Sequence, residues 1–140
     1  MKVRVLSCYF VFVFLSGVGV AVAQTGAGAV GVFEGHQDVG TVLHPGSAGF
    51  DTAKQSYTLT GSGENMWFGM DDFQFVWKKM SGDVAISANI TFVGEKGNEH
   101  RKAVLMIRQT LEGNAPAVDI ARHGVGLTSL QFRDAAGVHA

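Results

Sequence analysis

Only a few side chains of this 140-residue sequence are suited to recognising a ligand. The indole ring of Trp67 or Trp77 can stack on the C–H face of a sugar. The planar guanidinium of Arg108 or Arg133 can hold a carboxylate or two hydroxyls in bidentate fashion, and Lys102 adds a point charge. The candidate ligand-binding residues are therefore Trp67, Lys102, Arg108 and Arg133.

Each tryptophan has an alternative role in packing. Trp77 alternates with Phe73 and Phe75, so the three rings share one face if the segment is a strand, and we favour core packing for Trp77. Trp67 lies next to glycine-rich turns, and for this residue sugar stacking and core packing both stay open.

The cationic candidates have an alternative role in ion pairing. Two predicted strands can place four polar residues on one concave sheet face, namely Lys102, Arg108, Gln131 and Arg133. A half-buried cation in such a face must be paired, so we favour an internal salt bridge of Arg108 with Asp119 or Asp83.

Metal binding has weaker support in the sequence. Asp71 and Asp72, close to Glu64 and Asn65, supply the oxygen ligands that calcium prefers, but they lack EF-hand spacing. Adjacent acids in a turn are usually solvated, so no cofactor is expected and calcium is the lesser interpretation. The histidines show no pair at zinc-ligand spacing: His36, His44, His100, His123 and His139.

Catalysis is not expected in this segment. Glycoside hydrolysis needs two carboxyl groups held about 5–10 Å apart, and no strand carries acids at alternate positions that would supply them. The sequence contains no Gly-x-Ser-x-Gly elbow and no phosphate-binding loop.

The elements that must position these residues are strands. Residues 83–93 alternate strictly, which is the period of a strand with one buried face. One side carries Val84, Ile86, Ala88, Ile90 and Phe92, and the other carries Asp83, Ala85, Ser87, Asn89 and Thr91. Further strands are predicted at residues 32–43, 56–60, 73–80, 103–110, 117–123 and 127–133.

Short strands separated by glycine turns, without helical periodicity, predict an all-β, antiparallel two-sheet sandwich. After the strand at 127–133, residues 134–137 are typical of a turn, and Val138 is expected to begin a return strand. The sequence stops two residues later, so we expect a sandwich that is incomplete at its C-terminus.

The first residues have the pattern of a signal peptide. Lys2 and Arg4 precede an apolar run over residues 5–20, and small residues end at Ala23, so cleavage is predicted between Ala23 and Gln24. The predicted organisation is a leader at 1–23, a flexible lead-in at 24–31 and a domain at 32–140. The protein is accordingly expected to be exported, as a periplasmic or secreted protein.

Cleavage would change the composition. The eleven basic residues of the sequence become nine when Lys2 and Arg4 leave, against twelve acidic residues, which gives a net charge of −3. The single cysteine, Cys8, leaves as well. No disulfide can then form, and nucleic acid is an unexpected partner because no dense basic patch is present.

Ten short motifs resemble, in their order, the concanavalin A-like (laminin-G-like) β-sandwich modules of secreted bacterial proteins. Such modules occur beside glycosidase domains or fused to TolB-like propellers. The motifs lie at residues 38–40, 46–47, 50–51, 57, 61–63, 65–67, 72–73, 81–83, 102–103 and 106–108. One departure is Val104, where these modules usually carry glycine.

The resemblance implies a jelly-roll of two curved sheets and does not fix an activity. The expected function is a non-catalytic exported module that binds carbohydrate or another envelope component. The first alternative is an N-terminal structural or docking domain of a larger periplasmic Tol-type protein. The second is a fragment of a concanavalin-like glycoside hydrolase.

Overall fold

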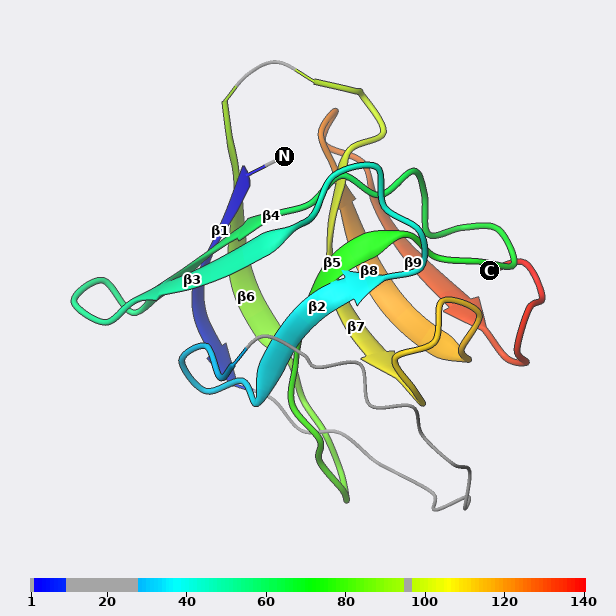
Figure 1. Cartoon of the computed structure of the whole chain (residues 1–140), viewed down its shortest axis with the longest axis horizontal. Coiled ribbons are helices and arrows are strands. Elements are labelled where there is room, and N and C mark those ends of the chain that lie inside the picture. The colour runs from blue at the N-terminus through cyan, green and yellow to red at the C-terminus, as the bar shows by residue number, and fades with distance from the viewer. Residues whose placement is uncertain (1, 10–27, 95–96) are drawn as a thin grey trace.

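The computed structural model describes residues 2–9, 28–94 and 97–140, and within these ranges it is all-β with no helix (Figure 1). The strands are β1 (Lys2–Tyr9), β2 (Gly35–Val39), β3 (Ser47–Asp51), β4 (Ser56–Thr60), β5 (Phe73–Trp77), β6 (Ser87–Val93), β7 (Lys102–Arg108), β8 (Ala117–His123) and β9 (Thr128–Arg133).

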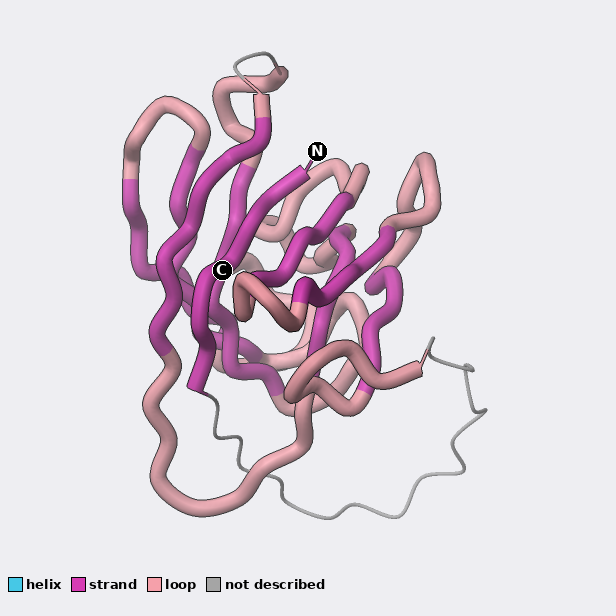
Figure 2. Tube along the Cα trace, turned by 90° about the vertical axis from the view of Figure 1, so that its left-hand side faces the viewer, coloured by secondary structure: helices cyan, strands magenta, loops and turns pink. Residues whose placement is uncertain are grey.

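The described strands form three sheets, and every pair within them is antiparallel. The sheets have the orders β3-β4-β1-β6, β2-β5 and β7-β8-β9. In Figure 1 the two-stranded β2-β5 sheet crosses in front of β7-β8-β9, and the turned view of Figure 2 shows no helical segment in the described residues. An all-β, antiparallel chain was predicted, and this part of the prediction is confirmed.

The core lies where the β2-β5 sheet packs on the β7-β8-β9 sheet. Its buried members come from both sheets and from the loop before β5: Val39, Met66, Phe73, Phe75 and Met106. Trp77 is half-buried and packs against this cluster, so the preferred interpretation of Trp77 as a packing residue is confirmed.

The alternation predicted for residues 83–93 is present. The five residues predicted to face inward are all half-buried, and the five on the other side are all exposed. The strand itself is shorter than predicted and begins at Ser87. Period-two patterning therefore identified the faces correctly, although it extended the strand too far toward its start.

The other face of the β7-β8-β9 sheet carries exposed apolar side chains on its last two strands. Val118, Ile120, Leu130 and Phe132 have relative exposures of 39%, 50%, 68% and 64%. We call these four residues the outer apolar face. In the described part of the chain these four side chains face outward.

Several expectations for the ends are changed or untested. Residues Lys2–Tyr9 of the predicted leader form β1, which lies between β4 and β6. The predicted cleavage site at Ala23 and Gln24 lies outside the described residues. The prediction that Val138 begins a strand is wrong, because residues 134–138 are turns and bends and Val138 receives a hydrogen bond from the Arg133 side chain instead.

In the loop between β4 and β5, the backbone of Gly63 packs directly against the backbone of Asp72. A Cβ atom built there would overlap the backbone carbonyl of Asp72, and neither backbone segment can step aside easily. We expect Gly63→Ala to lower the free energy of unfolding by about 3 kcal/mol. Gly49→Ala is the matched control, because no atom lies within 4 Å of its Cβ position. Urea unfolding of both variants tests this prediction, which fails if they lose the same stability.

Candidate functional site

The β7-β8-β9 sheet places the cationic candidates on one face. Lys102 lies opposite His123, Arg108 lies opposite Ala117, and Ala117 in turn lies opposite Arg133. Since directly opposite residues share a face, Lys102, Arg108 and Arg133 all point toward the β2-β5 sheet side. They nevertheless fall into two groups that do different things.

Arg108 and Arg133 converge on the buried carboxylate of Asp71. Arg133 makes a two-pronged contact at 2.7 and 2.8 Å, and Nη1 of Arg108 lies 3.3 Å from Oδ2 of Asp71. The three side chains are each at most 2% exposed. The pKa of Arg133 is raised by its hydrogen bond to Asp71, whereas desolvation lowers the pKa of Arg108.

Most of the remaining N–H groups of the two guanidiniums are also used. Arg108 donates to the backbone carbonyls of Thr110 and Glu112, and Arg133 donates to those of Phe68, Ala115 and Val138. Both arginines are therefore structural cross-links, as the alternative interpretation held for Arg108. Its partner, however, is Asp71 and not Asp119 or Asp83.

The contacts of Asp71 and Asp72 also concern their candidate role as calcium ligands. Both carboxylate oxygens of Asp71 accept from arginine, and the Oδ1 atom of Asp72 accepts from the backbone N–H of Thr41 at 2.6 Å. The two neighbouring acids thus serve different parts of the fold. Across the described residues, no group of three or more His, Cys, Asp or Glu side chains is placed to hold a metal ion.

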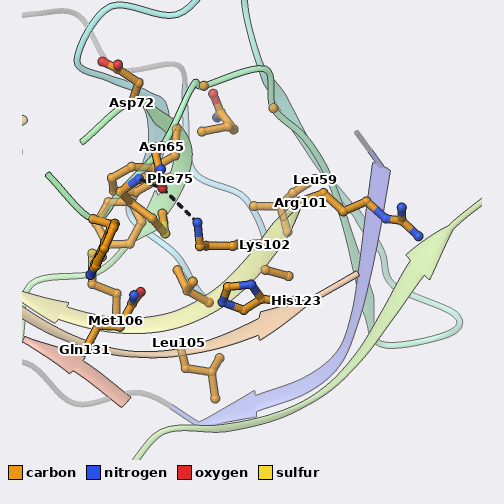
Figure 3. Close-up of a pocket in the computed structure, with 18 of the residues that line it drawn as sticks. Leu59, Asn65, Asp72, Phe75, Arg101, Lys102, Leu105, Met106, His123 and Gln131 are labelled. Carbon is orange, nitrogen blue, oxygen red and sulfur yellow. Dashed lines mark hydrogen bonds between the residues drawn. The ribbon is translucent and has the colours of Figure 1, made fainter. Parts of the chain in front are cut away.

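Lys102 faces a cavity of about 900 Å³ (Figure 3). Its ammonium donates to Oδ1 of Asn65 at 2.8 Å, and burial lowers its pKa. Phe75 and Met106 line the apolar part of the cavity near this pair, as Figure 3 shows. In this part of the cavity the Lys102 ammonium is therefore held in place beside apolar side chains.

Three polar groups on the same sheet face have an unused hydrogen-bonding atom. His123 Nδ1, Gln131 Oε1 and Asp119 Oδ1 are buried and have no hydrogen-bond partner among the described residues. Asp119 lies directly opposite Gln131, and His123 and Gln131 line the cavity. Such atoms are costly to bury unless something else pairs with them, so a ligand or ordered water is needed here.

Burial shifts the pKa values of two of these three groups, Asp119 and His123. Desolvation raises the pKa of Asp119 to about 7, reinforced by the Asp71 carboxylate and opposed by Lys102 and the two arginines. Desolvation lowers the pKa of His123, helped by the positive charges of Lys102 and His100. At neutral pH this sheet face therefore carries the Asp119 carboxyl group close to half-protonation and the His123 imidazole biased toward its neutral form.

Trp67 lies at the rim of this cavity. Its side chain is 50% exposed and its ring centroid is 5.6 Å from that of Phe68, which is 51% exposed. An exposed aromatic pair beside polar groups is suited to stacking on a ligand ring. Of the two interpretations left open for Trp67, exposure favours contact with a ligand over core packing.

The sequence did not single out all of these residues. Asn65 was considered only as a calcium ligand, and His123 only as a scattered histidine. Cross-strand register brings His123 to Lys102, and a loop brings Asn65 to the same ammonium. The strand alternation of residues 117–123 was the available signal for His123, because it puts that residue on the face of Asp119.

Comparison of the chain with protein-family models, with curated proteins and with solved structures finds no match. The described part of the chain contains no helix that is long and apolar enough to cross a membrane.

Proposed function

We propose that this protein is a non-catalytic, exported β-sandwich module of the concanavalin A-like kind that binds carbohydrate in the cavity beside Lys102. The support for a sandwich is the packing of the β2-β5 sheet on the β7-β8-β9 sheet around a shared apolar cluster. The support for export is the leader-like pattern of residues 1–23.

One observation carries the ligand proposal. His123 and Gln131 each present a buried polar atom without a partner in the described chain to a cavity that already holds the Lys102 ammonium. A sugar offers many hydroxyl groups, each able to donate and accept, and can satisfy both atoms at once. Its apolar ring face matches the exposed ring of Trp67 at the rim.

Arg108 and Arg133 do not belong to the proposed contact surface. Their donors are committed to Asp71 and to backbone carbonyls, so a ligand would have to break those contacts to reach them. The proposed binding residues are therefore Trp67, Asn65, Lys102, His123 and Gln131.

A glycan array followed by calorimetry on the best binder tests the proposal. We expect Trp67→Ala and Gln131→Leu each to weaken binding about tenfold or more, since the first removes a stacking surface and the second removes a buried hydrogen-bond acceptor. The matched control for Trp67 is Leu43→Ala, which removes an 82% exposed apolar side chain outside the cavity lining.

A third variant tests whether the positive charge of Lys102 contributes to binding. Lys102→Met approximates the length of the side chain and removes its charge, and Lys54→Met removes an exposed lysine whose ion pair in the described chain is with Asp51. Binding that persists unchanged in the Trp67, Gln131 and Lys102 variants would refute this site. Binding lost equally in the Leu43 and Lys54 controls would show that the effect is not local.

A further inference from the structure

The place of β1 in its sheet points to a second binding feature, which adjoins the cavity because Tyr57, Leu59 and Ile90 of the neighbouring strands also line it. β1 pairs with β4 on one side and with β6 on the other, both in antiparallel register. Among the described strands, β6 pairs with β1 alone, whereas β4 also pairs with β3. Removing β1 would therefore leave the regularly alternating strand β6 with no ladder partner in that part of the chain.

The strand that fills this position belongs to the predicted leader. Residues 2–9 contain the positive residues and the start of the apolar run that precede the predicted cleavage after Ala23. Export with cleavage would withdraw β1 and expose unpaired N–H and C=O groups along both β4 and β6. Unpaired strand edges of this kind readily accept another extended chain.

We propose that, after removal of residues 1–23, the gap between β4 and β6 binds an extended segment of a partner polypeptide as an added strand. We call this gap the strand slot, bounded by Ser56–Thr60 of β4 and Ser87–Val93 of β6. The partner segment runs antiparallel to both strands, in the position that β1 occupies in Figure 1.

The register defines the chemistry of the partner. Val3 is aligned with Leu59 and Phe92, and Val5 is aligned with Tyr57 and Ile90. These four aligned residues are all at least half-buried. The inward positions of the partner therefore require apolar, preferably β-branched residues.

The alternate positions have the opposite requirement. Lys2 is aligned with Thr60 and Val93, and Arg4 is aligned with Thr58 and Thr91. Thr91 and Val93 are exposed, so the intervening positions of the partner face solvent and should be polar or charged. The slot thus selects a segment of about five residues with an apolar residue at every second position, and a one-residue shift would reverse both faces.

The experiment compares the chain before and after cleavage by signal peptidase. The probe is a fluorescent peptide of residues 2–9 carrying Cys8→Ser, and fluorescence anisotropy reports its binding. We expect the cleaved chain to bind the peptide and the intact chain, whose slot is filled, not to bind it. A peptide with Val3→Lys and Val5→Lys should bind roughly 100-fold more weakly, because it loses the two apolar residues aligned with at least half-buried apolar positions of β4 and β6.

Each further outcome decides the proposal. If the cleaved chain loses its β circular dichroism, recovery on adding the peptide supports the slot, and failure to recover overturns it. A cleaved chain that stays folded and does not bind the peptide also overturns the proposal. The same holds if cleaved chains form a dimer that the peptide cannot dissociate. An exported protein that retains residues 1–23 in its mass spectrum would overturn it as well, since the slot would remain filled.

Discussion

Replacing Asp71 with asparagine is expected to lower the free energy of unfolding by about 4 kcal/mol. Asp71 neutralises two guanidiniums that are almost entirely shielded from water, and asparagine would leave both charges uncompensated. The isosteric amide keeps one carbonyl oxygen, so the loss reflects charge more than shape. Urea unfolding monitored by tryptophan fluorescence measures it.

The control is Asp51→Asn. Asp51 also pairs with a cation, Lys54, at 2.9 Å, but both side chains are largely in water. Solvent screens such a pair, so this variant should unfold close to the wild-type midpoint. Equal losses in Asp71→Asn and Asp51→Asn would contradict the central role given to the Asp71 cluster.

Replacing Asp119 with asparagine is expected to stabilise the protein at pH 8, by an amount on the order of 3 kcal/mol, and to change it little at pH 4. Burial raises the pKa of Asp119 to about 7 from the ordinary value of 3.8. Between these values the folded state holds a proton that the unfolded state has released. The contribution of Asp119 to stability therefore falls as the pH rises from about 4 to about 7 and is constant above that window.

The stability of the wild type and of Asp119→Asn is measured as a function of pH, and the difference between these two profiles gives the contribution of the Asp119 carboxyl group alone. Urea midpoints at unit steps between pH 4 and pH 8 give both profiles. Asp134→Asn, at an exposed position after β9, is the control and should run parallel to the wild type. Parallel profiles for Asp119→Asn would show that Asp119 ionises normally in the folded protein.

Strand faces were predictable because alternation is local information. The strand at residues 117–123 was predicted with the bounds that β8 has, and its burial alternates along its last five residues. β3 was not predicted, since Ser47–Asp51 consists mostly of small residues without an apolar alternation. It becomes a strand by pairing with β4, which is a tertiary effect that propensity does not record.

The buried ion cluster shows where sequence reasoning stops. Asp71 is 37 residues from Arg108 and 62 from Arg133, and no spacing rule connects them. Its neighbour Asp72 made the pair resemble an acidic turn, for which solvation was the preferred interpretation and calcium binding the lesser one. Only the packing of the loop before β5 against β7 and β9 brings the three charges together.

The outer apolar face has a practical consequence for handling the protein. Copies of the chain carry a formal net charge of only −1 at pH 7, so electrostatic repulsion between them is weak. Kosmotropic salts such as ammonium sulfate strengthen the burial of exposed apolar groups and will promote self-association through Leu130 and Phe132. We therefore expect dilute samples in chloride buffers to self-associate less through this surface than samples in ammonium sulfate.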